Sequence, residues 1–322
     1  MDKNKVSIII PCYNEQEYIG KAIESALGQT YDPIEVIVID DGSIDDSPEV
    51  IKSYDDKIIF RMTENGGAAH ARNRGVTVSS GEYLKFLDAD DWISSGAVEA
   101  LVSALEDSRK SVSMCPWSKL VPQGDGSWET DPGLPLAPRE GQDWIQSWLT
   151  GRYIPPCSVL WRRETFEDLG GWDETHTSND DGELMLRFLT KGGDIVTTDK
   201  GNAYYRQYQE QGESLSTRFS PETVRTRGMV IDKTRERLRS RGDVEEYRRE
   251  IGEAYQGVAR MAFHIGAWKL GRTYEAKARH IIGRLVKNGS VAHKILGTTF
   301  GLEGKERIAR WLDALTGVRS SN

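Results

Sequence analysis

Short apolar runs alternate with longer amphipathic segments over the first third of the chain. Residues 6–10, 34–39 and 57–61 form apolar runs that predict strands, whereas residues 15–27 repeat their apolar positions with helical spacing. Strands that alternate with helices at this pitch are typical of βαβ units. The sequence therefore predicts an α/β fold, a Rossmann-like, mostly parallel sheet flanked by helices.

One predicted strand, residues 83–87, ends in three carboxylates within four positions: Asp88, Asp90 and Asp91. Open α/β sheets bind their ligands at the carboxyl ends of the strands. Carboxylates this close repel one another unless a cation or protons compensate them, and the usual cations are Mg²⁺ and Mn²⁺, shared with substrate phosphates. The alternative interpretation is an acidic first turn of a helix, because negative charge stabilises a helix N-terminus.

The pattern of the remaining chain predicts further elements and a boundary. We expect strands at 112–117 and 158–161, edge strands at 195–198 and 202–205, a loop or hairpin over 122–138, and helices at 68–79, 96–109, 144–149 and from Asp180 onward. From residue 221 the pattern is almost wholly helical. We therefore expect one domain over residues 1–220, with halves of about 1–115 and 116–220, and a helical region over 221–322.

Charge is divided unevenly along this chain, whose net charge is −8. Residues 1–220 hold 21 basic and 38 acidic side chains, and residues 221–322 hold 21 basic and 12 acidic ones. The basic end lacks an aromatic stacking set and a reader motif, so we expect no nucleic-acid partner. Three scattered cysteines without a CxxC motif favour a reducing, cytosolic setting. We also expect no signal peptide and no membrane span, because a strand follows the polar start directly and no window approaches 18 apolar residues.

The ends of three predicted parallel strands carry candidate binding residues. The first strand ends in Pro-Cys-Tyr-Asn-Glu at 11–15, the second in Asp40 and Asp41, and a later one in the acids at 88–91. All fall on one edge of a parallel sheet, so we expect them to converge. The motifs GxGxxG and GxxxxGK[ST] are absent, which excludes a dinucleotide fingerprint and a P-loop. A phosphate-facing site would then need a metal ion and arginines such as Arg72.

Four segments in order carry a resemblance: VSIIIPCYNE, VIDDGSIDDS, NGGAAHARNRG and GEYLKFLDADDW. Together they resemble the family 2 glycosyltransferases over roughly residues 5–216. The resemblance implies a GT-A fold and an inverting transfer of a sugar from a nucleotide-diphosphate sugar, with UDP favoured, to a hydroxyl group. It also implies that the half at 1–115 binds the nucleotide sugar and the half at 116–220 binds the acceptor.

The resemblance further implies roles for residues on the donor side. Pro11, Tyr13 and Glu15 match the loop around the nucleobase, Asp41 matches the acid that accepts from the uracil N3–H, and Arg72 matches a basic residue near the diphosphate. Asp88 and Asp90 match the DxD motif, in which the first acid faces the ribose and a metal-bound water and the last binds Mn²⁺ or Mg²⁺ directly. Structural alternatives are a packed turn aromatic for Tyr13, an N-cap of the next helix for Asp41 and a surface arginine for Arg72. We expect Asp91 to cap the following helix.

On the acceptor side, residues 180–187 align with the family's Glu-Asp-x-Asp-Leu-x-x-Arg segment. Its second acid is the general base, which points to Asp181, and a helix cap is the structural alternative. Gly182 replaces an aromatic residue, which would widen the acceptor side. Arg206 and residues 209–217 are expected to close over the nucleotide sugar, whereas Tyr208 stands where many relatives carry histidine. The Gln-x-x-Arg-Trp motif of processive relatives is absent, so we expect single additions.

The expected acceptor is a growing glycan, glycolipid or glycoprotein, including lipid-linked forms. Residues 260–287 and 305–315 interleave basic and apolar positions, which would suit peripheral contact with the inner face of the cytoplasmic membrane. The alternative is a helical cap that packs on the catalytic domain or on a second copy as a homodimer. Two rival functions also stay open: a nucleotidyltransferase on a similar sheet, and a non-catalytic partner in glycan assembly.

Overall fold

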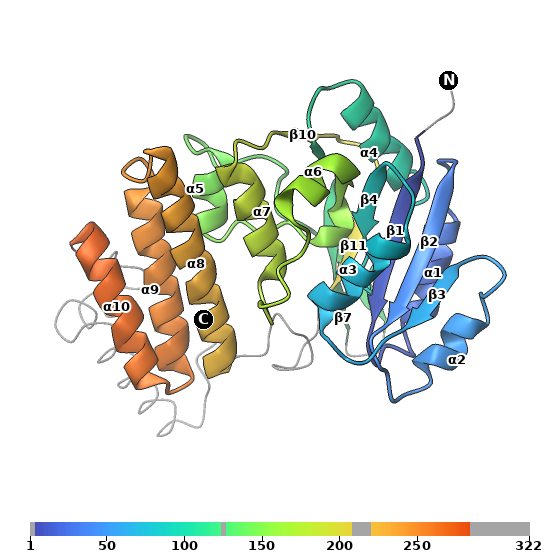
Figure 1. Cartoon of the computed structure of the whole chain (residues 1–322), viewed down its shortest axis with the longest axis horizontal. Helices are drawn as coiled ribbons and strands as arrows, with labels where there is room; N and C mark the ends of the chain where they lie inside the picture. Colours follow the sequence, from blue (N-terminus) through green and yellow to red (C-terminus); the bar gives the residue numbers. More distant parts are fainter. Residues whose placement is uncertain (1–3, 124–126, 208–219, 284–322) are drawn as a thin grey trace. The chain divides into compact units, whose positions relative to one another are not determined.

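A computed structural model describes residues 4–123, 127–207 and 220–283 of the chain (Figure 1). The described residues form two compact units. Unit 1 lies within Met1–Gly141 and Arg152–Glu213, and unit 2 lies within Gln142–Gly151 and Ser214–Asn322. Unit 2 therefore takes in a short segment from the middle of the first expected domain. The boundary near residue 220 stays a prediction.

Unit 1 is built on a seven-stranded sheet with the order β10-β6-β9-β4-β1-β2-β3. Figure 1 labels β1, β2, β3 and β4 of this sheet. The strands are β1 (Val6–Cys12), β2 (Ile34–Asp40), β3 (Ile59–Met62), β4 (Tyr83–Phe86), β6 (Val112–Met114), β9 (Val159–Arg162) and β10 (Ile195–Thr197). β1 pairs in parallel with β2 and β4, β2 with β3, and β6 with β10, whereas β9 is antiparallel to both of its neighbours. The predicted mostly parallel sheet is thus confirmed.

Six helices in the described part of unit 1 accompany this sheet, and each buries one of its faces. They are α1 (Ile19–Leu27), α2 (Ser47–Lys52), α3 (Ala68–Val78), α4 (Ala97–Glu106), α6 (Arg163–Leu169) and α7 (Asp180–Thr190). α1 buries four apolar residues with helical spacing, from Ile19 to Ala26. α3 lies directly on β1 and β2, since a Cβ atom at Gly75 would collide with the side chain of Ile9. Every residue of β1 is buried, so the core of unit 1 runs along this strand.

A second, four-stranded sheet has the order β5-β11-β7-β8. Its strands are β5 (Trp92–Ile93), β7 (Trp117–Pro122), β8 (Trp128–Pro132) and β11 (Ala203–Arg206). The predicted strand at 112–117 is wrong as a single strand, because β6 and β7 belong to different sheets and the chain passes between them at Cys115 and Pro116. The predicted edge position of residues 202–205 is also wrong, since β11 pairs with β5 on one side and β7 on the other. β8 completes a hairpin with β7 within the predicted segment 122–138, and β10 is an edge strand as expected.

Unit 2 is helical in its described part. α8 (Pro221–Arg241), α9 (Arg248–His264) and α10 (Trp268–Ile282) pack on one another, and α5 (Trp144–Leu149) packs on α9. Two basic residues of α10 have acidic partners, since Lys277 pairs with Asp232 at 2.7 Å and Arg279 with Glu275 at 2.8 Å. In the described ranges, no helix combines the length and the apolar character needed to cross a bilayer. The second predicted membrane segment, 305–315, and Arg284 and Lys287 of the first lie outside the described residues.

Candidate active site

The ends of β1, β2 and β4 lie side by side because these strands are neighbours in the sheet. Backbone pairing continues past the strand ends, where the Asp41 N–H donates to the Cys12 carbonyl at 2.8 Å and the Leu87 N–H to the Ile9 carbonyl at 3.0 Å. The segment at 11–15, Asp41 and the acids at 88–91 therefore share one edge of the sheet. The expected convergence of these strand ends is confirmed.

The loop after β1 places its predicted residues in contrasting surroundings. Pro11 is buried at the end of the strand, Glu15 is half-buried, and Tyr13 is 47% exposed. The alternative of a packed turn aromatic at Tyr13 is therefore wrong, and its ring is open to a ligand. Burial, followed by repulsion from Asp90, raises the pKa of Glu15 to about 8. Glu15 and Asp90 thus lie close enough for their charges to interact.

Asp41 is buried and bound by its own chain. Its carboxylate accepts hydrogen bonds from the backbone N–H of Gly66 at 3.0 Å and of Gly67 at 2.7 Å, and from the Thr63 hydroxyl at 3.2 Å. These donors belong to the turn that leads into α3. The position before α2 is occupied by Asp46, so the alternative that Asp41 caps the next helix is wrong. A carboxylate accepts about four hydrogen bonds, so this residue is close to saturation before any ligand arrives.

Arg72 of α3 joins two acids that are far apart in the sequence. Its Nη2 atom lies 2.6 Å from Asp88 Oδ1 and its Nη1 atom 2.6 Å from Asp180 Oδ2. The guanidinium also lies 4.6 Å from the ring centroid of Trp172. Arg72 is only 5% exposed, so the alternative of a surface arginine is wrong. The DxD segment and the N-terminus of α7 are therefore connected through one buried cation.

Asp181 lies in the first turn of α7, beside Asp180. The N-cap position belongs to Asn179, a non-glycine residue with a φ of 57°. Burial, followed by repulsion from Asp180, raises the pKa of Asp181 to about 7. An acid with such a pKa exchanges protons readily near neutral pH. Gly182 does not widen this side, because the side chain of Asn179 occupies the space that a Cβ atom would take.

Asp91 is buried between the DxD turn and β11. Its Oδ1 atom accepts a hydrogen bond from the backbone N–H of Arg206 at 2.9 Å. Burial, followed by repulsion from Asp90 and Asp88, raises its pKa well above the ordinary value of an aspartate. The predicted cap of the following helix is wrong, because the N-cap of α4 is Gly96. Asp91 instead attaches the DxD turn to the second sheet.

Arg206 has a second contact with the same turn. Its Nε atom donates to the Asp90 carbonyl at 2.9 Å, and its guanidinium lies 3.8 Å from the ring centroid of Tyr18 and 4.2 Å from that of Trp128. The Trp92 ring lies 5.5 Å away. Within the described part of the chain, the buried Nη1 atom has no hydrogen-bond partner. The aromatic box of Tyr18, Trp92 and Trp128 was not predicted, because its members come from three distant segments whose common partner is visible only in the fold.

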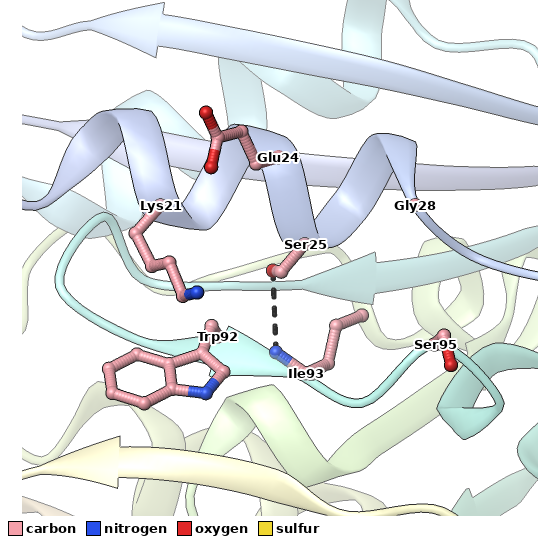
Figure 2. A pocket seen from close by; sticks show the side chains of 7 residues that line it. All are labelled: Lys21, Glu24, Ser25, Gly28, Trp92, Ile93 and Ser95. Carbon is pink, nitrogen blue, oxygen red and sulfur yellow. Dashed lines mark hydrogen bonds between the residues drawn. The ribbon is translucent and has the colours of Figure 1, made fainter.

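A small hollow of ≈ 240 Å³ lies between α1 and β5 (Figure 2). It is lined by Lys21, Glu24, Ser25, Gly28, Trp92, Ile93 and Ser95. The ammonium group of Lys21 lies 5.7 Å from the Trp92 ring centroid, and the Ser25 hydroxyl accepts a hydrogen bond from the Ile93 N–H at 3.3 Å. None of the predicted donor or base residues lines this hollow. The candidate active site is therefore defined by the strand ends and α7.

A divalent cation fits Asp88 and Asp90 as part of a site shared with a substrate. Among the residues with described positions, no group of three or more His, Cys, Asp or Glu side chains could hold a metal ion. Mg²⁺ commonly binds through one or two carboxylates plus substrate phosphates, so a protein cage is not required. The Asp88 side chain is 25% exposed, and Asp90 is half-buried and repels Glu15. These residues fit a cation that binds together with a phosphate-bearing substrate.

The fold and this edge of acids define a class of protein. A mostly parallel sheet flanked by helices is the architecture of GT-A glycosyltransferases. The family follows from the sequence, because the pattern of the family described as "Glycosyl transferase family 2" matches residues 7–170. The chain belongs to this family, as the resemblance implied. The nucleotidyltransferase alternative is therefore not supported.

Two relatives illustrate the similarity. An uncharacterized glycosyltransferase of Rickettsia typhi is 33% identical over 186 residues, which cover 57% of this chain and 58% of the relative. The glycosyltransferase GlyG of Streptococcus pneumoniae is 29% identical over 233 residues, which cover 66% of this chain and 74% of GlyG. The matched region thus spans little more than half of the length of the first relative.

Solved structures share the fold at low sequence identity. Residues 1–349 of S. aureus TarS match with a TM-score of 0.66 and 16% identity, over 98% of this chain and 92% of TarS. The same fragment in complex with UDP-GlcNAc has a TM-score of 0.58 and 19% identity, over 85% and 89% of the two chains. The mannosyltransferase PcManGT from Pyrobaculum calidifontis, in complex with GDP-Man and Mn²⁺, has a TM-score of 0.53 and 16% identity, over 98% and 88%. These likenesses confirm the GT-A fold.

Proposed function

We propose that the protein transfers one sugar from a nucleotide-diphosphate sugar to a hydroxyl group with inversion at C1, with a divalent cation at Asp88 and Asp90. The observation that carries this proposal is the link from Asp88 through Arg72 to Asp180. It connects the acids of the donor side with the helix turn that holds Asp181. An acid with a pKa of about 7 thus belongs to the same site as the DxD acids.

Inversion needs one base and one stabilised leaving group. The acceptor hydroxyl gives its proton to the Asp181 carboxylate while its oxygen forms a bond to C1 of the sugar. The bond from C1 to the diphosphate oxygen breaks on the opposite face, and its electron pair leaves with the nucleoside diphosphate. No protein nucleophile takes part. Asp181 has a suitable pKa because burial and the adjacent Asp180 disfavour its charged form.

The donor side requires positive charge near the diphosphate. Asp90 and Asp88 would hold Mn²⁺ or Mg²⁺, which neutralises negative charge on the leaving oxygen. Arg206 presents its buried Nη1 atom beside this turn, where a phosphate oxygen could accept from it. The exposed ring of Tyr13 would lie against the nucleobase, with Pro11 and Glu15 in the same loop. Asp41 would shape the nucleobase pocket by holding the turn at 63–67 in place. Its carboxylate would also accept a hydrogen bond from the nucleobase.

The identity of the nucleotide rests on the fold relatives and on this loop. UDP is favoured because the TarS fragment has been solved with UDP-GlcNAc and with UDP, although PcManGT has been solved with GDP-Man. The acceptor would be a growing glycan, glycolipid or glycoprotein, and each turnover would add a single sugar. The basic C-terminal region over 221–322 would bring the enzyme to an anionic membrane surface from the cytoplasmic side or join two copies.

Donor hydrolysis tests the reaction without a known acceptor, because water can replace the acceptor hydroxyl. The purified protein is incubated with a panel of UDP-, dTDP- and GDP-sugars and Mn²⁺, and the first sugar released is followed by ¹H NMR before it mutarotates. An α-linked donor should release the β-anomer, and EDTA should abolish the release. Release of the α-anomer would contradict inversion, and equal rates in EDTA would contradict the role of the cation.

A further inference from the structure

Arg72 divides one positive charge between two acids that the proposed reaction assigns to different sides. Asp88 follows β4 on the donor side, and Asp180 opens α7 next to Asp181. Both contacts measure 2.6 Å, with Asp88 and Asp180 side chains 25% and 18% exposed. Partly desolvated pairs of this kind interact more strongly than pairs at the surface. A change in charge at Asp88 therefore alters how strongly Arg72 holds Asp180.

The residue type suits this division. A guanidinium presents two terminal nitrogens in a rigid plane and can bond two acids at once, whereas the lysine ammonium is a single point charge. The Trp172 ring against the guanidinium and the position of Arg72 within α3 limit its movement. The guanidinium therefore bonds both acids at once, through Nη2 to Asp88 and through Nη1 to Asp180.

We propose that Arg72 is a positioning residue that couples occupancy of the donor site to the placement of the base-bearing turn of α7. The proposal rests on the proposed function, because it takes Asp88 as a donor-side ligand and Asp181 as the base. A cation and a nucleotide diphosphate at Asp88 compete with Arg72 for this carboxylate. The guanidinium then binds Asp180 more tightly, and the turn with Asp181 is held more firmly once the donor is present.

Coupling of this kind is reciprocal, so a change at Asp180 must affect donor binding. The variant Asp180→Asn removes the charge on the acceptor side and leaves Arg72 to pair with Asp88 alone. A cation then has to compete with a stronger pair. We expect the Kd of UDP in the presence of Mn²⁺ to rise by about fivefold or more, within the range typical of coupled sites. Asp199→Asn is the matched control, because Asp199 is an exposed aspartate in the segment between β10 and β11 and has no part in the proposed site.

A double-mutant cycle separates coupling from a direct contact. Isothermal titration calorimetry of UDP with Mn²⁺ is carried out on wild type, Asp180→Asn, Arg72→Met and the double variant. The effect of Asp180→Asn should disappear in the Arg72→Met background, because no guanidinium remains to be redistributed. Arg72→Lys retains the positive charge but has only one nitrogen, so it cannot bond both acids in the same way. The effect of Asp180→Asn on the Kd of UDP should be less than half as large in this background. This variant serves if Arg72→Met does not fold.

The outcomes distinguish this proposal from the function on which it rests. Binding of UDP with Mn²⁺ by the wild type, together with an unchanged Kd in Asp180→Asn, overturns the coupling and leaves the transferase proposal intact. Equal effects of Asp180→Asn with and without Arg72 also overturn it. If the wild type binds no nucleotide sugar of the panel and hydrolyses none, the proposed function fails, and the coupling fails with it.

Discussion

The acids after β2 and the acids after β4 look alike in the sequence but have different environments. Asp41, after β2, is buried and accepts from the backbone N–H groups of Gly66 and Gly67. Asp88, after β4, is partly exposed and pairs with the side chain of Arg72. The Asp90 side chain repels Glu15, and the pKa of Asp91 is raised by burial and by its acidic neighbours.

This difference shows how charge crowding is resolved at each strand end. Backbone donors of a turn hold the Asp41 carboxylate in place and make it part of the fold. The three acids at 88–91 repel one another and raise the pKa of Asp91, so this group gains from an added cation or from protons. We infer that the β2 end mainly shapes the pocket and that the β4 end binds the reactive part of the donor.

The strongest test of this contrast compares the variants Asp90→Ala and Asp41→Ala in donor hydrolysis and in stability. Asp90→Ala removes a proposed metal ligand, and the lost charge stabilisation of about 4 kcal/mol corresponds to a decrease of roughly 10³-fold in kcat/KM for donor hydrolysis. The exposed Asp56 offers a matched control, because Asp56→Ala removes an acid far from the strand ends and should retain the wild-type rate. Mn²⁺-dependent activity that survives Asp90→Ala would remove the DxD interpretation.

Asp41→Ala should act first on stability. It leaves the Gly66 and Gly67 N–H groups without their carboxylate, which should lower the free energy of unfolding by about 3 kcal/mol, in the range for hydrogen bonds to charged groups. Urea denaturation of the ligand-free protein, compared with Asp56→Ala, measures this change. An unchanged unfolding midpoint together with lost nucleotide binding would show that Asp41 serves the ligand alone.

The pH dependence should reflect Asp181. The base must be ionised to accept a proton, and its pKa is raised to about 7. With Mn²⁺ and donor present, kcat/KM should therefore fall by about tenfold per unit as the pH drops below 7. Measurement of kcat/KM from pH 5 to 9, with a donor that is stable in acid, checks this expected fall. A rate that stays flat down to pH 5 would assign the base role to a group with an ordinary carboxylate pKa.

We expect Asp91 to have a smaller effect, on how the stability of the folded protein changes with pH. Its folded-state pKa lies well above the unfolded value, so its stabilising contribution is present at acidic pH and is lost as the pH rises through the folded value. Asp91→Asn cannot ionise and still accepts from the Arg206 N–H. Its thermal midpoint should fall less than that of the wild type between pH 5 and pH 8. Parallel curves for the two proteins would contradict a protonated Asp91.

Local pattern predicted part of the site and could not predict the rest. β1, β2 and β4 were predicted because buried parallel strands appear in the sequence as continuous apolar runs. Asp88 and Asp90 were found because they come just after the end of one such run. The contacts of Arg72 were not predictable, since Asp88 is 16 residues away and Asp180 is 108 residues away. The edge position expected for residues 202–205 was wrong because period and composition do not reveal how many neighbours a strand has.

The proposal that Asp181 is the base is tested most directly by comparing binding and turnover in Asp181→Asn. Amide replaces carboxylate at nearly the same size, so the variant should bind UDP with Mn²⁺ within about threefold of the wild-type Kd, a change of less than 1 kcal/mol. Its donor hydrolysis and sugar transfer should fall by about 10²–10⁴-fold, the usual contribution of a general base. Turnover close to wild type in this variant, with binding intact, would contradict the assignment of Asp181 as the base.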